Sequence, residues 1–167
     1  MTQSIAERWA ALFEEEYPAS RRIIGALPDV HHPFKPHAKS MAAGLLAWHI
    51  AGGFKWDADL ILSGKDLIVE PGYTPPPPPD STDEILRRFD QYVNEALPQL
   101  RGLPDGVMDK PLSLCAPDGS RLFTLPTVSW LYRVNLGHMI HHRGQLTVYL
   151  RLLDIPVPGA YGPSADE

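Results

Sequence analysis

Apolar residues recur at three- and four-residue intervals in four stretches of the chain, a spacing that places them on one face of an α-helix. We therefore expect four amphipathic helices, at about residues 4–26, 41–63, 81–100 and 127–153. Pro18 lies inside the first of them, and because proline lacks a backbone donor we expect a kink there.

Serine and glycine residues mark the expected helix ends. Ser-x-x-Glu sequences beginning at Ser4 and Ser81 have the form of capping boxes, in which the serine and glutamate side chains bond each other's backbone N–H groups. Ser40 is the expected N-cap of the second helix. Gly64 and Gly102 follow the second and third helices, where glycine commonly ends a helix.

The connections between these helices are rich in proline. Residues 70–80 include five consecutive prolines, Pro75 to Pro79, and favour a stiff, extended connector, with a proline-recognition ligand for a partner as the alternative. Residues 112–124 alternate around a Pro-Asp-Gly turn and predict a small hairpin or Ω-loop before the last helix. The expected fold class is all-α: a four-helix bundle with long proline-rich connections, in a single domain over residues 1–167.

The composition excludes several classes of protein. The 167 residues are 44% hydrophobic and 21% charged, which is ordinary for one globular domain. The net charge of −5 argues against a nucleic-acid partner, which requires clustered cations. No apolar run reaches the roughly 18 residues of a membrane span, and no signal-peptide pattern begins the sequence. We therefore expect a cytoplasmic protein with no membrane partner, and Cys115, the single cysteine, forms no internal disulfide.

Histidines interrupt the apolar face of the fourth helix. His138 and His142 are four residues apart and share that face with Leu131 and Leu146. A buried imidazole needs partners for both nitrogens, so this pair indicates either a shared metal ion or two hydrogen-bonded core histidines. Pairing of His138 with His141 is also geometrically possible.

A further histidine lies on the inward face of the second helix. His49, His138 and His142 form an inward-facing set, and facing helices of a bundle commonly assemble metal sites. Three neutral imidazoles leave a divalent ion an open position for water or substrate, as in catalytic sites. Zinc, nickel, iron or manganese would suit these ligands. A di-iron carboxylate site is not expected, because the chain has no Glu-x-x-His motif.

Three segments, at residues 39–51, 135–146 and 156–167, together resemble the DinB family of DinB/YfiT-like four-helix proteins. The most specific is the Asn-x-x-His-x-x-x-His-Arg-Gly-Gln block at 135–145 combined with an upstream helical histidine, and the resemblance covers nearly the whole chain. It implies a four-helix bundle, commonly a homodimer, with a three-histidine metal site at His49, His138 and His142. His141 then becomes a neighbour of the site.

Other residues near this motif have two interpretations each. Asn135, His141, Arg143 and Gln145 are candidates for supporting the metal ligands or contacting substrate. Arg143 forms either a salt bridge at the helix surface or a contact with an anionic substrate. Gln145 either orients a histidine or satisfies buried groups. The pair Gly52–Gly53, inside the second helix, indicates either close helix packing or room for a ligand.

The resemblance implies a functional hypothesis. Members of the family include metal-dependent transferases and isomerases that use a low-molecular-weight thiol, bound to the metal as thiolate. The first hypothesis is therefore a divalent-metal-dependent enzyme, a thiol-dependent S-transferase or a hydrolase, acting on a small molecule. The alternative is a non-catalytic metal-binding or stress-related bundle, and a third hypothesis is an interaction module that uses the proline run.

Overall fold

Four long helical rods dominate the computed structural model, which describes residues 2–72 and 76–167. The first three rods are α1 (Ile5–Gly25), α2 (Ala43–Ser63) and α3 (Thr82–Arg101). The fourth consists of three consecutive pieces, α4 (Thr127–Ser129), η3 (Trp130–Leu136) and α5 (Gly137–Leu152). Short 3₁₀ turns, η1 (Asp29–His31) and η2 (Asp105–Val107), lie in the connections. All four helices expected from the sequence are present.

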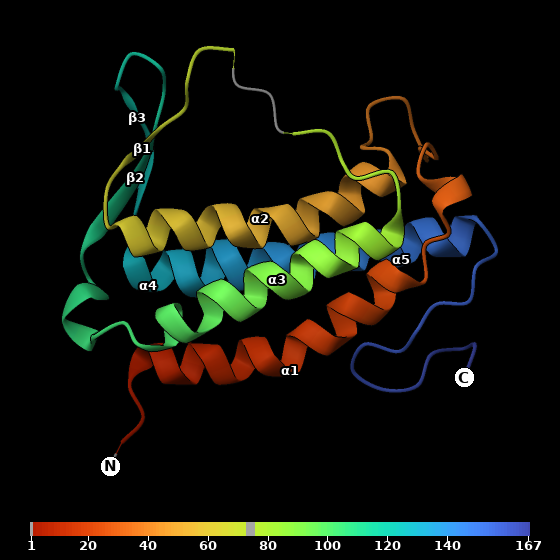
Figure 1. Ribbon diagram of the computed structural model, residues 1–167, viewed down its shortest axis with the longest axis horizontal. Coiled ribbons are helices and arrows are strands. Elements are labelled where there is room, and N and C mark those ends of the chain that lie inside the picture. Colours follow the sequence, from red (N-terminus) through yellow and green to blue (C-terminus); the bar gives the residue numbers. More distant parts are fainter. Residues whose placement is uncertain (1, 73–75) are drawn as a thin grey trace.

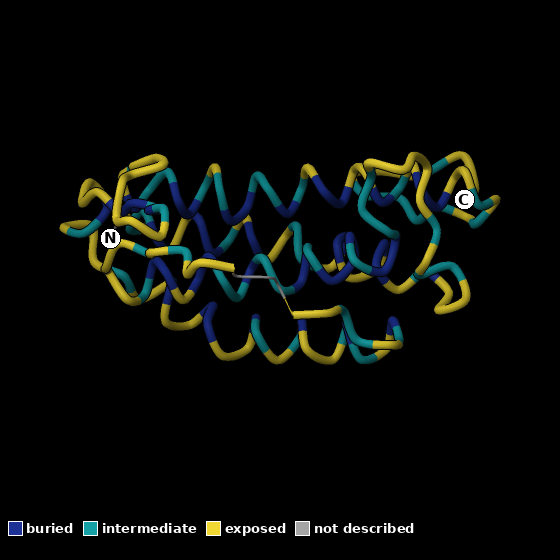
Figure 2. The backbone as a smooth tube through the Cα atoms, turned by 90° about the horizontal axis from the view of Figure 1, so that it is seen from above, coloured by how far each residue is buried: buried dark blue, intermediate teal, exposed yellow. Residues whose placement is uncertain are grey.

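The helices pack side by side around a common core (Figure 1). Each of α1 and α2 packs against both α3 and α5, so the four rods form a closed arrangement. Figure 2 shows buried and exposed positions alternating along the helices, as expected for helices that each turn one face inward. The core is rich in large side chains, with Trp9, Phe13, Phe89 and Trp130 fully buried.

The N-termini of the helices confirm two predicted N-caps and correct a third. Ser81 caps α3 by accepting a hydrogen bond from the backbone N–H of Glu84 at 3.2 Å. Ser4 and Glu7 form the complete capping box of α1. The helix α2 does not start after Ser40; its N-cap is Ala42, which makes no side-chain cap. Carbonyl groups of the preceding loop replace such a cap, because the first N–H groups of α2 donate to the backbone oxygens of residues 34 and 32 at 2.8 and 3.0 Å.

A small sheet corrects the expectation of an all-α chain. The predicted hairpin is present as strands β2 (Pro111–Cys115) and β3 (Arg121–Pro126), which pair antiparallel. A third strand, β1 (Leu67–Ile68), pairs in parallel with β2, in the order β1-β2-β3. Only two residues form β1, too few to show an alternating pattern in the sequence. The sheet lies beside one end of the helices (Figure 1).

The fourth helical rod is not the uniform α-helix that its periodicity predicts. Residues Trp130–Leu136 form a π-helical segment, η3, directly before α5. At its end the N–H of Gly137 donates to the carbonyl oxygen of Tyr132, five residues earlier. The wider turn changes which side chains of the rod point toward the core, directly before His138. Such π segments frequently lie at functional sites.

The remaining predictions concern the connections and the first helix. α1 contains Pro18 and bends midway along its length in Figure 1. Part of the expected connector, residues 73–75, lies outside the described residues, whereas residues 76–79 carry neither helix nor strand. Within the described residues, no helix combines the length and apolar character needed to cross a membrane.

Candidate metal centre

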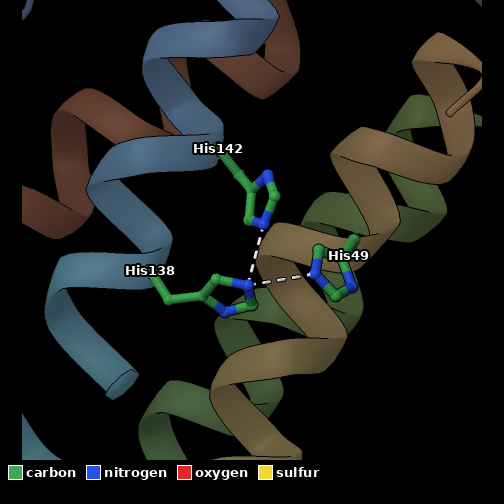
Figure 3. A group of neighbouring side chains, drawn as sticks. All are labelled: His49, His138 and His142. Carbon is green, nitrogen blue, oxygen red and sulfur yellow. Dashed lines mark hydrogen bonds between the residues drawn. The ribbon is translucent and has the colours of Figure 1, made fainter. Parts of the chain in front are cut away.

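Three histidine side chains from two helices converge on one point (Figure 3). His49 comes from α2, and His138 and His142 come from successive turns of α5. The Nε2 atom of His138 lies 3.3 Å from Nε2 of His49 and 2.8 Å from Nε2 of His142. The histidines predicted from helical spacing are therefore brought together. Among the described residues, this is the group of potential ligands that lies close enough to hold a metal ion.

The convergence fits a metal ion better than a network of hydrogen bonds. A neutral imidazole nitrogen is either a donor or an acceptor. Nε2 of His138 can therefore form a hydrogen bond with only one of its two neighbours, Nε2 of His49 or Nε2 of His142. A cation accepts a lone pair from every ring. Nitrogens that bind a tetrahedral ion at about 2.0–2.1 Å are separated by about 3.3 Å. The Nε2 atoms of His49 and His138 have this separation, and those of His138 and His142 are closer, at 2.8 Å. The donor set therefore fits a divalent ion.

Gln145 fixes the orientation of one of these rings. The Nδ1 atom of His142 lies 2.7 Å from the side-chain oxygen of Gln145, one turn further along α5. Since that oxygen only accepts, Nδ1 carries the proton and Nε2 presents its lone pair to the cluster. The contact is the one expected if Gln145 orients a histidine, which is one of the two interpretations that the sequence left open.

Burial lowers the pKa of all three imidazoles. Desolvation is the largest cause at each ring, and neighbouring histidines lower the values further. The pKa of His138 falls to about 4. At His142 the hydrogen bond with Gln145 acts in the opposite direction, but desolvation outweighs it. The rings are therefore neutral near pH 7, which is the form of imidazole that binds metals.

A cavity of about 880 Å³ adjoins the cluster. His49 and His138 form part of its wall, whereas His142 lies behind them, buried. Most of the wall is apolar, and five aromatic side chains contribute to it: Trp48, Trp56, Tyr92, Phe123 and Trp130. Large, mainly apolar cavities with a few polar groups are typical of small-molecule sites.

The two glycines of α2 open this cavity. Gly52 and Gly53 both lie in its wall. A Cβ atom at Gly53 would meet only the ring of His138, at 3.9 Å, and one at Gly52 would meet only the ring of Trp48, at 3.4 Å. No neighbouring helix backbone approaches either position, so close helix packing does not account for the pair. The space they leave belongs to the cavity.

Asp57 is a residue of this cavity that the sequence analysis missed. It lies in the cavity wall and is 4% exposed. Burial raises the pKa of its carboxyl group from 3.8 to about 7. The available signal was its position eight residues after His49, which places both on similar faces of α2, about 12 Å apart along the helix axis. Buried acids with shifted pKa values in a cleft are frequently functional.

The other predicted site residues have distinct positions. His141 is exposed, lines the cavity and lies outside the converging set. Asn135 is buried in η3 and donates from its amide to the backbone oxygen of Phe54 at 3.3 Å, which ties η3 to α2. Within the described residues its Oδ1 atom has no hydrogen-bond partner.

Arg143 faces away from the cavity. Its guanidinium group is buried and lies 2.6 Å from the carboxylate of Glu16 in α1. It also donates to the hydroxyl oxygen of Tyr161, in the C-terminal tail, at 2.7 Å. The structure therefore shows an ion pair, as in one interpretation of the sequence, but between buried elements and not at the helix surface. Arg143 joins α5, α1 and the tail.

Comparisons with known proteins agree with the fold. The sequence profile of the DinB superfamily matches residues 12–146. The uncharacterized protein YrdA of Bacillus subtilis is 26% identical over an alignment of 159 residues, and the alignment covers 93% of this chain and 87% of that protein.

Two crystal structures of DinB-like proteins have the same fold. One, from Bacillus cereus, has a TM-score of 0.69 and 25% identity, and covers 96% of this chain and 100% of its own. The other, YjoA from Bacillus subtilis, has a TM-score of 0.67 and 20% identity, and covers 94% of this chain and 99% of its own. The profile spans most of the chain and includes all three converging histidines, and the chain therefore belongs to the DinB superfamily.

Proposed function

We propose that the protein is a divalent-metal-dependent enzyme, a thiol-dependent S-transferase or a hydrolase, that acts on a small molecule. His49, His138 and His142 are the proposed ligands, with zinc or nickel as the preferred ion and iron or manganese as alternatives. The observation that carries the proposal is that His49 and His138, two of the three converging histidines, lie in the wall of a mainly apolar cavity of about 880 Å³. A protein that only stored or sensed metal would not require such a space beside its ligands.

The residues of the site have separate tasks in this proposal. When bound, a divalent ion would lower the pKa of a coordinated thiol or water and make it a nucleophile near pH 7. Gln145 keeps the lone pair of His142 directed into the cluster. The aromatic wall binds the apolar part of the substrate and excludes water from the reacting groups. None of the proposed ligands is a carboxylate, so the ion keeps its full charge.

A direct test uses protein purified without an affinity tag and loaded with Zn²⁺ or Ni²⁺. A set of low-molecular-weight thiols would be offered with monochlorobimane, whose chloride the sulfur displaces, and nitrophenyl acetate would report hydrolysis. We expect metal-dependent turnover that is lost in His142→Ala and kept in His37→Ala. His37 is an exposed loop histidine and thus a matched control. Equal rates with and without metal for every pair of reactants would contradict the proposal.

The assembly and location of the chain belong to the proposal as well. We propose one domain over residues 1–167, a cytoplasmic homodimer, and no membrane or nucleic-acid partner. The family resemblance supports the homodimer, and the net charge of −5 supports the absence of a nucleic-acid partner. Light scattering coupled to gel filtration measures the oligomeric state, and a mass equal to one chain at micromolar concentration would contradict the homodimer.

A further inference from the structure

Asp57 is a buried acid without a partner among the residues that the structure describes. Its side chain lies in the cavity wall and is 4% exposed, and among the described residues its carboxyl group takes part in no hydrogen bond or ion pair. Desolvation is the one cause of its raised pKa, with no opposing effect from a nearby cation. Aspartate is rarely buried in this way unless it is paired, because burying an unpaired charge is costly. A partner supplied from outside the chain would remove this cost.

The cations of the cavity wall do not serve as that partner. Lys55 donates to Asp59 at 2.6 Å and is thereby paired on the same helix. Arg133 is exposed and makes no ion pair with Asp57. The histidines of the wall, His49, His138 and His141, make no hydrogen bond or ion pair with Asp57. A negative charge at Asp57 is thus uncompensated within the described part of the protein.

We propose that Asp57 binds a positively charged nitrogen of the substrate, which places the substrates among small, largely apolar amines. The carboxylate supplies the ion pair, and the aromatic faces of the same wall attract a cation and bury its apolar body. The inference rests on the proposed function, because it takes the cavity to be the substrate site. Asp57 is a specificity-determining residue in this account.

The geometry also sets the size of the substrate. Asp57 and His49 lie eight residues apart on α2, about 12 Å along the helix axis. A molecule held by its nitrogen at Asp57 therefore reaches the histidine cluster when a chain or ring system of roughly this length separates its amine from its reacting group. Gly52 and Gly53 lie between the two residues and leave the path open.

The test compares three probes that share one apolar body: phenylbutylamine, the neutral phenylbutanol and the anionic phenylbutyrate. Isothermal titration calorimetry at about pH 8, above the pKa of Asp57, measures their affinities for the full chain with and without Zn²⁺. Asp57→Asn removes the charge and nearly preserves the shape. Asp59→Asn is the matched control, because it removes an exposed acid from the same wall.

We expect the wild-type protein to bind the amine at least tenfold more tightly than the alcohol, and the anion most weakly. Asp57→Asn should abolish the preference for the amine and leave the affinity for the alcohol within about twofold, whereas Asp59→Asn should keep the preference. Equal affinities for amine and alcohol, an intact preference in Asp57→Asn, or no binding of any probe would overturn the inference. Circular dichroism confirms that Asp57→Asn is folded.

This binding test separates the inference from the proposed function. If the protein prefers the amine but shows no metal-dependent turnover, Asp57 is still an amine-binding residue, and the proposed enzymatic activity is contradicted. If the protein shows metal-dependent turnover but no preference for the amine, the proposed enzymatic activity is supported and the proposed role of Asp57 is contradicted. Binding to metal-free His142→Ala protein provides the third comparison, since Asp57 lies away from the histidine cluster and should still select the amine there.

Discussion

The Nδ1 atom of His142 donates a hydrogen bond to the side-chain oxygen of Gln145, 2.7 Å away. This contact decides which nitrogen of His142 faces the cluster. Gln145 itself is exposed, so its value to the protein lies in this hydrogen bond and not in packing.

Replacing Gln145 should therefore weaken metal binding with little effect on folding. In Gln145→Ala the affinity for Zn²⁺ should fall by about 10- to 100-fold, because the ring loses the contact that fixes its tautomer and orientation. Competition against a coloured chelator measures the affinity. Gln99→Ala, on the exposed face of α3, is the control. Unchanged affinity in Gln145→Ala would show that the hydrogen bond does not support the site.

Asp57 should make the stability of the protein depend on pH. Its pKa is raised in the folded protein, so the folded state retains a proton that the unfolded state has lost between pH 3.8 and about 7. Stability is thereby lost as the pH rises through this window. The free energy of unfolding of Asp57→Asn, relative to wild type, should increase from about pH 4 to pH 8 by up to about 4 kcal/mol.

Urea unfolding of both proteins across that range checks this prediction. The histidines titrate in both proteins and cancel in the comparison. A difference between the two free energies that stays constant with pH would show that the carboxyl group is not buried in the folded protein.

The glycines of α2 should cost stability. Because a Cβ atom at Gly53 meets only the His138 ring at 3.9 Å, Gly53→Ala fits without a clash. It should raise the free energy of unfolding by roughly 0.5–1 kcal/mol, the usual gain for alanine over glycine inside a helix. Chemical denaturation of the metal-free protein provides the measurement, and a loss of stability would mean that the cavity wall has no room for a methyl group.

Replacing Arg143 should lower the stability of the protein without changing its metal content. Arg143→Met removes a buried cation and leaves the partly exposed carboxylate of Glu16 without its partner, and the free energy of unfolding should fall by about 2–4 kcal/mol. Adding Glu16→Gln to the same protein should recover part of the loss, because no unpaired charge then remains. Metal content should be that of wild type in both variants. Loss of metal with unchanged stability would place Arg143 in the site instead.

The sequence predicts the helices well because their apolar spacing is long and regular. It also places His49, His138 and His142 on inward faces, which was enough to bring three side chains from distant parts of the chain together. The capping box at Ser4 was recognisable because all its contacts lie within four residues.

Features that depend on distant contacts were not predictable in the same way. The strand β1 exists because two residues find a partner in β2, and the start of α2 is satisfied by carbonyl groups of a folded loop. The π segment η3 differs from an α-helix in that its hydrogen bonds span five residues instead of four, a difference that apolar spacing does not resolve. The burial of Asp57 and Arg143 is a property of the assembled helices, so the sequence alone left the first unnoticed and the second undecided.

The most direct test of the central claim is the metal content of tag-free protein, measured by elemental analysis after equilibration with Zn²⁺ and Ni²⁺ and removal of free ions. We predict close to one ion per chain in wild type and in His141→Ala, and almost none in His49→Ala, His138→Ala or His142→Ala. A wild-type protein without metal, or equal losses in all four variants, would contradict the assignment of the three converging histidines as the ligands.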